Sequence, residues 1–182
     1  QVFYDFRLVS QDFVASQVAF DIPGKQAVFL DGSHSKLLSL SLEKKQSQVL
    51  SVDEKLKNPF AVTVVNRKAY VLGQEGVVEL SLPLDQIGRM AIEATEQWQG
   101  PRLIGSYGTN AYIVDAKQRN IYRYDLEDQG ASPSAWLASK EGIDFEKIMS
   151  IAVDGDVWMT TSEGSIHKFT RGDEVPFTVT GL

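Results

Sequence analysis

Apolar and polar residues alternate in short blocks along the chain, and the clearest pattern lies at residues 111–125. Two runs rich in β-branched and aromatic residues, 111–114 and 121–124, flank the polar segment 115–120. Apolar runs of this length joined by a polar turn are typical of a β-hairpin. Comparable hairpins are predicted for the stretches that begin at Ala27, Ala69 and Asp156.

The hairpins recur at a nearly constant spacing. Their first runs align Val28, Tyr70, Tyr112 and Val157, and their second runs align Leu37, Val77, Ile121 and Ile166. The repeat is therefore about 40–45 residues long, which is the length of a four-stranded propeller blade. We predict an all-β fold, a β-propeller of four-stranded blades in a single domain or propeller fragment, with repeats at roughly 12–53, 54–98, 99–140 and 141–182.

Each hairpin is expected to form the two middle strands of its blade. The inner strands are predicted at 17–20, 60–65, 103–107 and 149–153, and the outer strands at 48–51, 89–93, 134–137 and 177–180. The segment 84–98 also carries apolar residues at helical spacing, so a helical insertion is the alternative to an outer strand there.

An additional outer strand is predicted for the amino-terminal segment, residues 1–9. The last repeat already has its own outer strand in this prediction, so the additional strand would complete a preceding blade. The four repeats would then be a slice of a larger ring, since propellers typically have four to eight blades. A slice with open blade faces is expected to self-associate through them.

Composition and charge narrow the classes of function. The chain has 182 residues and a formal net charge of −6, and its basic residues are scattered, which argues against a nucleic-acid surface. It has no cysteine, so disulfides, thiolate metal sites and thiol nucleophiles are excluded. No apolar run approaches the roughly 20 residues of a membrane span, and we expect no membrane contact by this segment.

Two aspartates, Asp31 and Asp115, occupy the same repeat position, where the first strand of a hairpin enters its turn. Calcium ligation is one interpretation, but no oxygen-rich loop accompanies either residue. An Asx-type turn, in which the carboxylate accepts local backbone N–H groups, is preferred. His167 lies at a packing position and is expected to be partly buried and hydrogen-bonded, whereas His34 lies in a turn and is expected to be solvated. We expect no metal site and no cofactor.

The predicted binding face is the hairpin-turn end of each repeat, meaning the hairpin turn and the loop that enters the inner strand. Trp98 and Arg102 flank a Gln-Gly-Pro turn there, and interfaces favour Trp and Arg as anchors. The alternative is that Trp98 folds under the blade edge and Arg102 is merely solvated. Asn58, at a strand entrance, and His34 and Arg119, in hairpin turns, are further candidates for contact with a ligand or partner. No catalytic residue is predicted.

The hairpins resemble the NHL and YWTD-type propeller repeats. The resemblance rests on an apolar strand that ends in Asp, a polar turn and an Arg/Lys/Asn–Ile–aromatic strand, as residues 112–125 and 28–41 show. Gly73 and Thr160 replace the Asp in the other two repeats. This resemblance implies a propeller fold.

A looser resemblance is carried by residues 3–5, 58–60 and 165–172. These are similar to uncharacterised bacterial propellers, some of which follow a PP2C-type phosphatase domain and a membrane span. The resemblance implies the sensory or docking part of a larger membrane-anchored protein, and it favours an extracytoplasmic or cell-surface location.

We therefore expect a non-catalytic module that binds a protein or a small-molecule ligand on its loop face. The alternative is a metal-dependent propeller hydrolase of the lactonase type with an axial divalent cation. Such an enzyme needs carboxylates on its inner strands, and the inner strands predicted here contain no acidic residue. A purely structural scaffold is the third possibility.

Overall fold

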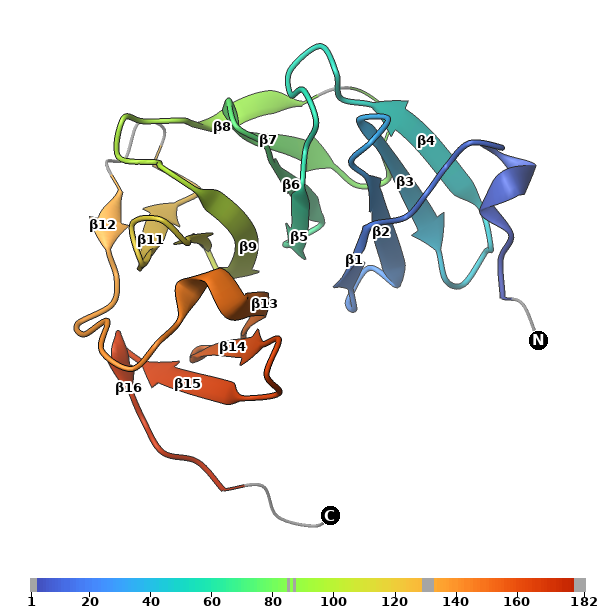
Figure 1. Ribbon diagram of the computed structural model, residues 1–182. Helices are drawn as coiled ribbons and strands as arrows, with labels where there is room; N and C mark the ends of the chain where they lie inside the picture. Colours follow the sequence, from blue (N-terminus) through green and yellow to red (C-terminus); the bar gives the residue numbers. More distant parts are fainter. Residues whose placement is uncertain (1–2, 85, 87, 129–132, 179–182) are drawn as a thin grey trace. The chain divides into compact units, whose positions relative to one another are not determined.

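The computed structural model of the protein describes residues 3–84, 86, 88–128 and 133–178. Its strands form four four-stranded antiparallel sheets, each built from strands that are consecutive in the chain (Figure 1). This is the topology of propeller blades. The predicted fold class is confirmed, because the chain is an all-β propeller with four blades. Within the described residues, no helix has the length and apolar character needed to cross a membrane.

The chain divides into two compact units, Gln1–Thr95 and Glu96–Leu182, with two blades in each. The strands of the first unit are β1 (Gln17–Asp21), β2 (Gln26–Asp31), β3 (Lys36–Ser41) and β4 (Ser47–Ser51), then β5 (Ala61–Val65), β6 (Lys68–Leu72), β7 (Gly76–Ser81) and β8 (Arg89–Glu93). Those of the second unit are β9 (Pro101–Tyr107), β10 (Asn110–Asp115), β11 (Asn120–Asp125) and β12 (Ser134–Ala135), then β13 (Ile148–Val153), β14 (Val157–Thr161), β15 (Ile166–Thr170) and β16 (Asp173–Glu174).

The described residues of the segment 84–98 include an outer strand, β8, as preferred from the sequence, and they include no helix. In the β7–β8 register, Glu79 lies opposite Arg89 and Val77 lies opposite Ile92, so the ladder satisfies the backbone groups and buries Ile92. Gly88 permits the close approach of the two strands, because a Cβ atom there would lie 1.5 Å from the carbonyl oxygen of Glu79.

The outer strand predicted at residues 177–180 is wrong over its described part, residues 177–178. The fourth blade ends with β16 instead, because Arg171 and Gly172, with φ values of 54° and 95°, reverse the chain directly after β15. Phe177 does not pair with a strand but places its ring edge-on to Trp158, with 5.3 Å between the ring centroids. Residues 179–180 lie outside the described residues.

The additional outer strand predicted for the amino-terminal segment is also wrong over its described part. Phe6–Leu8 form a short 3-10 helix, η1, whose N-cap Asp5 accepts a hydrogen bond from the backbone N–H of Arg7. Residues 1–2 lie outside the described residues.

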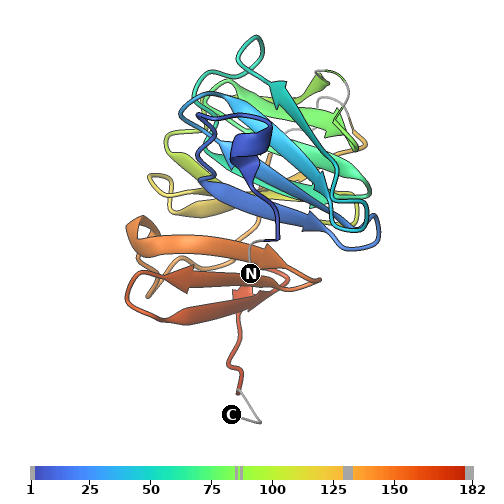
Figure 2. The same ribbon diagram turned by 90° about the vertical axis from the view of Figure 1, so that its right-hand side faces the viewer.

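This amino-terminal segment covers one face of the first blade (Figure 2). The ring of Phe6 lies 4.5 Å from that of Phe29 and 5.7 Å from that of Phe13, measured between centroids. Leu38 and Leu40 of β3 complete this cluster. The aromatic side chains bury more apolar surface across a sheet face than they would along a sheet edge, which explains why the segment crosses the blade.

The strand register shifts the alignment of the fourth repeat by one residue. Trp158 lies opposite Lys168, as Val28 lies opposite Ser39. Trp158, not Val157, is therefore the counterpart of Val28. By the same register, Thr161 and not Thr160 holds the position of Asp31.

Each unit has its own apolar core between its two blades. In the first unit, side chains that alternate along β2, β3, β6 and β7 form it, among them the fully buried Leu30, Leu37 and Leu80. In the second unit, Phe145 and Phe169 are the largest fully buried side chains. Burial of each such side chain contributes about 1.5–3 kcal/mol, so these clusters hold the blades of a unit together.

One apolar strip remains exposed along β1 and at Ile22 directly after it, and it is expected to mediate self-association. Val18, Phe20 and Ile22 are 46%, 51% and 73% exposed, whereas Ala19 between them packs into the core of the first unit. A contiguous apolar strip on a strand favours contact with a second molecule. We expect light scattering to show a mass that rises with concentration, and the double variant Val18→Ser/Phe20→Ser to remain monomeric.

The matched control for this prediction is Leu8→Ser, since Leu8 is 77% exposed but lies in η1, outside the strip. It should associate like the unmodified chain. A monomer at every concentration, or equal dissociation by the control variant, would contradict the prediction.

Candidate functional site

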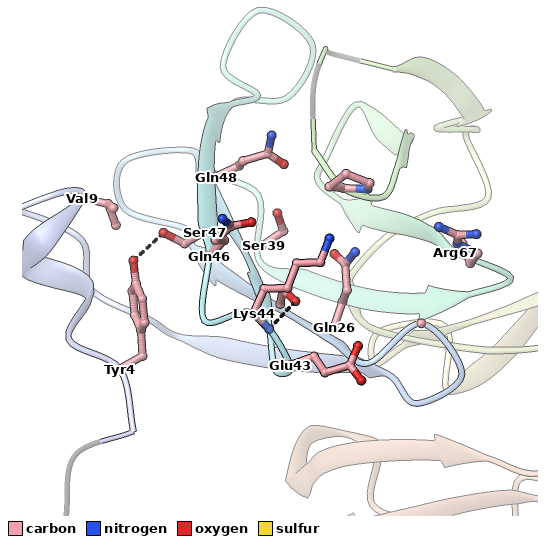
Figure 3. A pocket seen from close by; sticks show the side chains of 13 residues that line it. Tyr4, Val9, Gln26, Ser39, Glu43, Lys44, Gln46, Ser47, Gln48 and Arg67 are labelled. Carbon is pink, nitrogen blue, oxygen red and sulfur yellow. Dashed lines mark hydrogen bonds between the residues drawn. The ribbon is translucent and has the colours of Figure 1, made fainter.

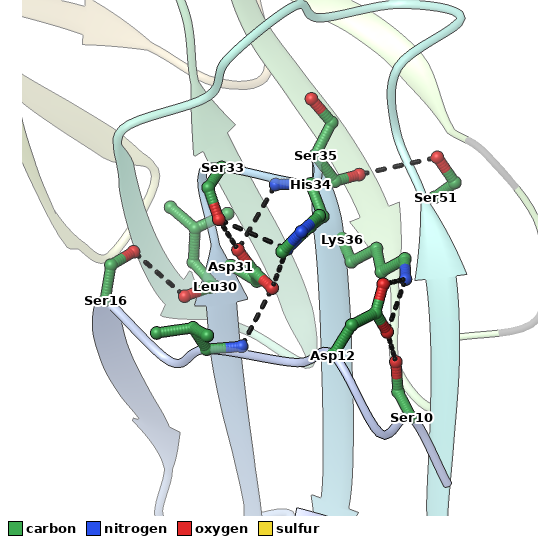
Figure 4. A network of polar contacts seen from close by, with 11 residues as sticks. Ser10, Asp12, Ser16, Leu30, Asp31, Ser33, His34, Ser35, Lys36 and Ser51 are labelled. Carbon is green, nitrogen blue, oxygen red and sulfur yellow. Dashed lines mark hydrogen bonds and ion pairs between the residues drawn. The ribbon is translucent and has the colours of Figure 1, made fainter. Parts of the chain in front are cut away.

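A buried carboxylate closes the hairpin turn of the first blade. Asp31 is fully buried, and its oxygens accept hydrogen bonds from Ser33 Oγ at 2.6 Å, the His34 backbone N–H at 3.2 Å and the Val14 backbone N–H at 2.8 Å (Figure 4). Ser33 and His34 belong to the turn itself, which confirms the predicted Asx-type geometry. Val14 belongs to the segment that enters β1, so the carboxylate also ties this segment to the turn.

These hydrogen bonds stabilise the charged form of Asp31. Burial by itself would raise the pKa of Asp31, but the bonds from Ser33, Val14 and His34 outweigh it and hold the pKa well below its usual value. The carboxylate is therefore ionised at neutral pH, and its negative charge is spread over several donors.

Asp115 closes the hairpin turn of the third blade with a similar set of hydrogen bonds. It is fully buried and accepts from the backbone N–H of Gln118 in its own turn, at 3.0 Å. It also accepts from the backbone N–H groups of Gln99 and Gly100, at 2.8 and 3.0 Å, in the loop that enters β9. The aspartate motif of the sequence thus fixes the hairpin-turn end of one blade in each unit.

Two candidate residues from the sequence, His34 and Asn58, lie at the hairpin-turn end of the first blade. His34 Nδ1 lies 2.7 Å from Asp31 Oδ2, and the side chain is 41% exposed, in agreement with its predicted solvated position. Asn58 is exposed in the left-handed backbone region, with φ of 49°. Its backbone N–H donates to the side-chain oxygen of Ser35, at 3.2 Å, so the loop of Asn58 is fixed to the turn of His34.

Trp98 is not a surface anchor. It is only 9% exposed, and its indole N–H donates to the Tyr124 hydroxyl at 2.7 Å. The two rings also meet edge-on, at an angle of 82°. The alternative from the sequence, in which Trp98 folds under the blade edge, is therefore the one that the structure shows.

The two candidate arginines, Arg102 and Arg119, converge on one loop of the second unit. Arg102 donates to the carbonyl oxygen of Glu146 at 2.8 Å and lies 3.6 Å from its carboxylate. Arg119 donates to the carbonyl oxygens of Lys140 and Ile143, at 3.2 and 3.3 Å. Their guanidinium groups hold the loop that enters β13. Neither interpretation of Arg102 from the sequence, as an interface anchor or as a solvated side chain, included this role.

A pocket of about 450 Å³ lies between this loop and the hairpin turn of the third blade. Ala116, Lys117 and Arg119 form the wall on the turn, and Ile143, Asp144, Phe145 and Glu146 form the wall on the loop. One wall therefore carries two cations and the other carries two carboxylates. Lys117 makes no hydrogen bond or ion pair with another described residue through its ammonium group, so this cation remains available.

Sequence reasoning missed Lys117 and Glu146 as members of one site. Each lies in a loop of the predicted binding face, but the two residues are 29 positions apart in the sequence. The only signal in the sequence was their position in loops at the same end of neighbouring repeats.

The other histidine is packed, as predicted. His167 Nδ1 lies 2.7 Å from a carboxylate oxygen of Glu174, and 18% of the side chain is exposed. It pairs β15 with β16 and lies outside the pocket.

The inner strands contain one acidic residue that the predicted bounds had excluded. β1 extends to Asp21, which is 5% exposed. Within the part of the chain that the structure describes, no three His, Cys, Asp or Glu side chains gather in a group that could hold a metal ion.

Comparisons with known proteins support the fold class. No protein family matches the sequence, and no curated protein matches it. Among solved structures, the chain is similar to a chain of a nidogen/laminin complex, with a TM-score of 0.71 and 15% identity, over 92% of this chain and 65% of that one. It is also similar to virginiamycin B lyase from Staphylococcus aureus, with a TM-score of 0.62 and 10% identity, over 86% of this chain and 51% of that one.

A third similar structure is regucalcin, a calcium-binding protein from Agrobacterium tumefaciens, with a TM-score of 0.50 and 14% identity, over 90% of this chain and 73% of that one. Identities this low show the fold alone, which is a β-propeller. The resemblance to YWTD and NHL repeats rests on the hairpin residues of the sequence. The chain spans about two thirds of the nidogen-complex chain and about half of the lyase. None of these three proteins is described as a phosphatase, so attachment to a phosphatase domain remains a prediction of the resemblance alone.

Proposed function

We propose that the chain is a non-catalytic binding module that recognises a protein partner in the pocket between residues 115–120 and 140–147. The observation that carries this proposal is that both walls of the pocket are held by internal hydrogen bonds. Asp115 fixes the turn, and Arg102 and Arg119 fix the loop through its carbonyl oxygens.

Fixed walls favour binding because little conformational entropy is lost when a partner enters. Loops on a rigid scaffold are also where propellers and other folds place their recognition residues. A pocket of about 450 Å³ accommodates one or two side chains of a partner loop. Lys117 on one wall and Glu146 on the other then select a segment that presents an acidic and a basic side chain.

The test is selection of loop peptides from a displayed library on the immobilised chain, followed by measurement of their affinity. We expect enriched peptides with one acidic and one basic residue. Lys117→Glu should weaken their binding about tenfold, because it replaces attraction of the acidic residue by repulsion. Arg119 is not chosen, since its loss would release the loop.

The matched control is Arg123→Glu, the same change of charge at an exposed position of β11 outside the pocket. It should bind like the unmodified chain. Absence of any enriched peptide, or equal weakening by Lys117→Glu and Arg123→Glu, would overturn the proposal.

The role of this module within a larger protein is proposed from the looser resemblance alone. On that basis we propose that the module is the sensory part of a larger membrane-anchored protein, at an extracytoplasmic or cell-surface location. The lactonase-like hydrolase has fold similarity in its favour, since similar propellers include a lyase and a calcium-binding protein. At 10% and 14% identity that similarity supports no particular reaction.

A further inference from the structure

A second pocket, of about 640 Å³, lies in the first unit (Figure 3). It opens over β2, β3 and β4 at the end of the first blade opposite its hairpin turn. Arg67 and Pro83 of the second blade bound it on the other side. It belongs to a different unit from the pocket proposed above, and it uses none of the residues predicted from the sequence.

The floor of this pocket interrupts an apolar sheet face. Side chains at alternate positions share a face of a strand, so Gln26 of β2 and Ser39 of β3 share a face with the core residues Leu30 and Leu37. Ser39 lies directly opposite Gln48 of β4. The face is thus apolar near the hairpin turn and carries neutral amides and hydroxyls at its other end.

The second and fourth blades hold paired charges at these positions. In the second blade the counterparts of Gln26, Ser39 and Gln48 are Lys68, Glu79 and Arg89. Glu79 lies 3.1 Å from the Lys68 ammonium and 3.3 Å from the Arg89 guanidinium.

The fourth blade follows the same pattern. The counterparts of Gln26 and Ser39 there are Asp156 and Lys168, which pair at 2.9 Å. Polar groups at these positions are therefore satisfied within their own blade in both cases. The first blade departs from this arrangement.

The side chains of Gln26, Ser39 and Gln48 make no hydrogen bond to any described residue. Ser39 is only 3% exposed, and within the described residues no fully buried side-chain polar atom lacks a partner. The hydroxyl of Ser39 therefore opens into the pocket. The Ser39 hydroxyl is thus nearly enclosed and unpaired, and such a group is expected to find an external partner. Gln26 is half-buried and Gln48 is exposed, so both amides are accessible to the same partner.

We propose that this pocket binds a saccharide that carries a carboxylate. Carboxamide groups both donate and accept hydrogen bonds, as the hydroxyl groups of a sugar do, so Gln26 and Gln48 match adjacent sugar hydroxyls. Arg67 is exposed, and its guanidinium group makes no ion pair with another described residue. It supplies the forked donor that a carboxylate prefers, and the volume fits a disaccharide.

The experiment is calorimetric titration of the full chain with digalacturonate and with the neutral disaccharide of galactose in the same linkage. We expect digalacturonate to bind more tightly. Arg67→Gln should lower the affinity for digalacturonate about tenfold and leave the affinity for the neutral disaccharide unchanged. The double variant Gln26→Leu/Gln48→Leu should have a lower affinity for both ligands. Circular dichroism verifies that this variant folds.

The matched control is Lys57→Gln, which removes an exposed cation of the first unit outside this pocket. It should leave the affinities for both disaccharides unchanged. Ser39→Ala is a nearly isosteric second test variant, and it should lower both affinities. Absence of binding by either disaccharide would overturn the proposal. So would equal effects of Arg67→Gln and Lys57→Gln on digalacturonate, or no effect of the glutamine double variant.

Discussion

Replacing Asp31 or Asp115 by Asn is expected to lower the free energy of unfolding by about 3 kcal/mol, because hydrogen bonds to a buried charged group contribute about 1.5–3 kcal/mol each. Asp115 accepts three backbone N–H groups from two separate segments. Asparagine retains one acceptor oxygen and turns an NH₂ group toward a backbone donor, which leaves donors unpaired. Urea denaturation followed by circular dichroism measures the loss.

The matched control is Asp125→Asn. Asp125 is exposed and accepts one local hydrogen bond, from the backbone N–H of Glu127 at 2.9 Å. Water can replace that hydrogen bond, so the free energy of unfolding of this variant should fall by less than about 1 kcal/mol. If Asp115→Asn and Asp125→Asn had the same small effect, the buried clamp would not be a determinant of stability.

Acid provides a second measurement for Asp31. The pKa of this carboxyl is lower in the folded protein than in the unfolded chain, so folding favours the ionised form. Its contribution is complete above the unfolded pKa, about 3.9, and is lost as the pH falls from there through the folded value. The free energy of unfolding of the unmodified chain should therefore fall over this acidic range. The free energy of unfolding of Asp31→Asn should fall less over the same range.

The regular part of the fold follows from short-range sequence signals. Strands with alternating or continuous apolar residues, and turns built on Asp, Gly and Asn, predict each blade up to its third strand. The fourth strands are harder, because an outer strand has one neighbour and little apolar content. β16 shows this best: Arg171 and Gly172 place it directly after β15, whereas the apolar residues near Phe177 had suggested a later start.

The sites depend on contacts that the sequence does not contain. Arg102 is an exposed cation by sequence, but its donation to the Glu146 carbonyl joins two loops that are 44 residues apart. The sequence indicates only part of the polar pocket floor that Gln26, Ser39 and Gln48 form. The sequence shows that the position of Ser39 is polar in every repeat, but not that its counterparts Glu79 and Lys168 form ion pairs within their own blades.

Trp98→Ala is expected to destabilise the second unit by about 3–5 kcal/mol, the usual cost of deleting a large buried aromatic side chain. Trp98→Phe retains part of the ring but loses the hydrogen bond to Tyr124, so it should cost about 1–2 kcal/mol. Tyr124→Phe removes the acceptor of the same bond. In a double-variant cycle, the effects of Trp98→Phe and Tyr124→Phe should therefore be less than additive.

This series distinguishes packing from recognition. A residue that anchors a partner tolerates removal with little loss of stability, because its side chain is exposed in the free protein. Trp98 is 9% exposed and hydrogen-bonded to Tyr124, so we expect its replacement to lower the stability of the protein and not its affinity for peptides. Loop-peptide binding by Trp98→Phe should persist under conditions in which that variant is folded. Normal stability of Trp98→Ala with complete loss of peptide binding would contradict this, and would place the docking surface on the loop before β9 instead of the pocket beside Arg119.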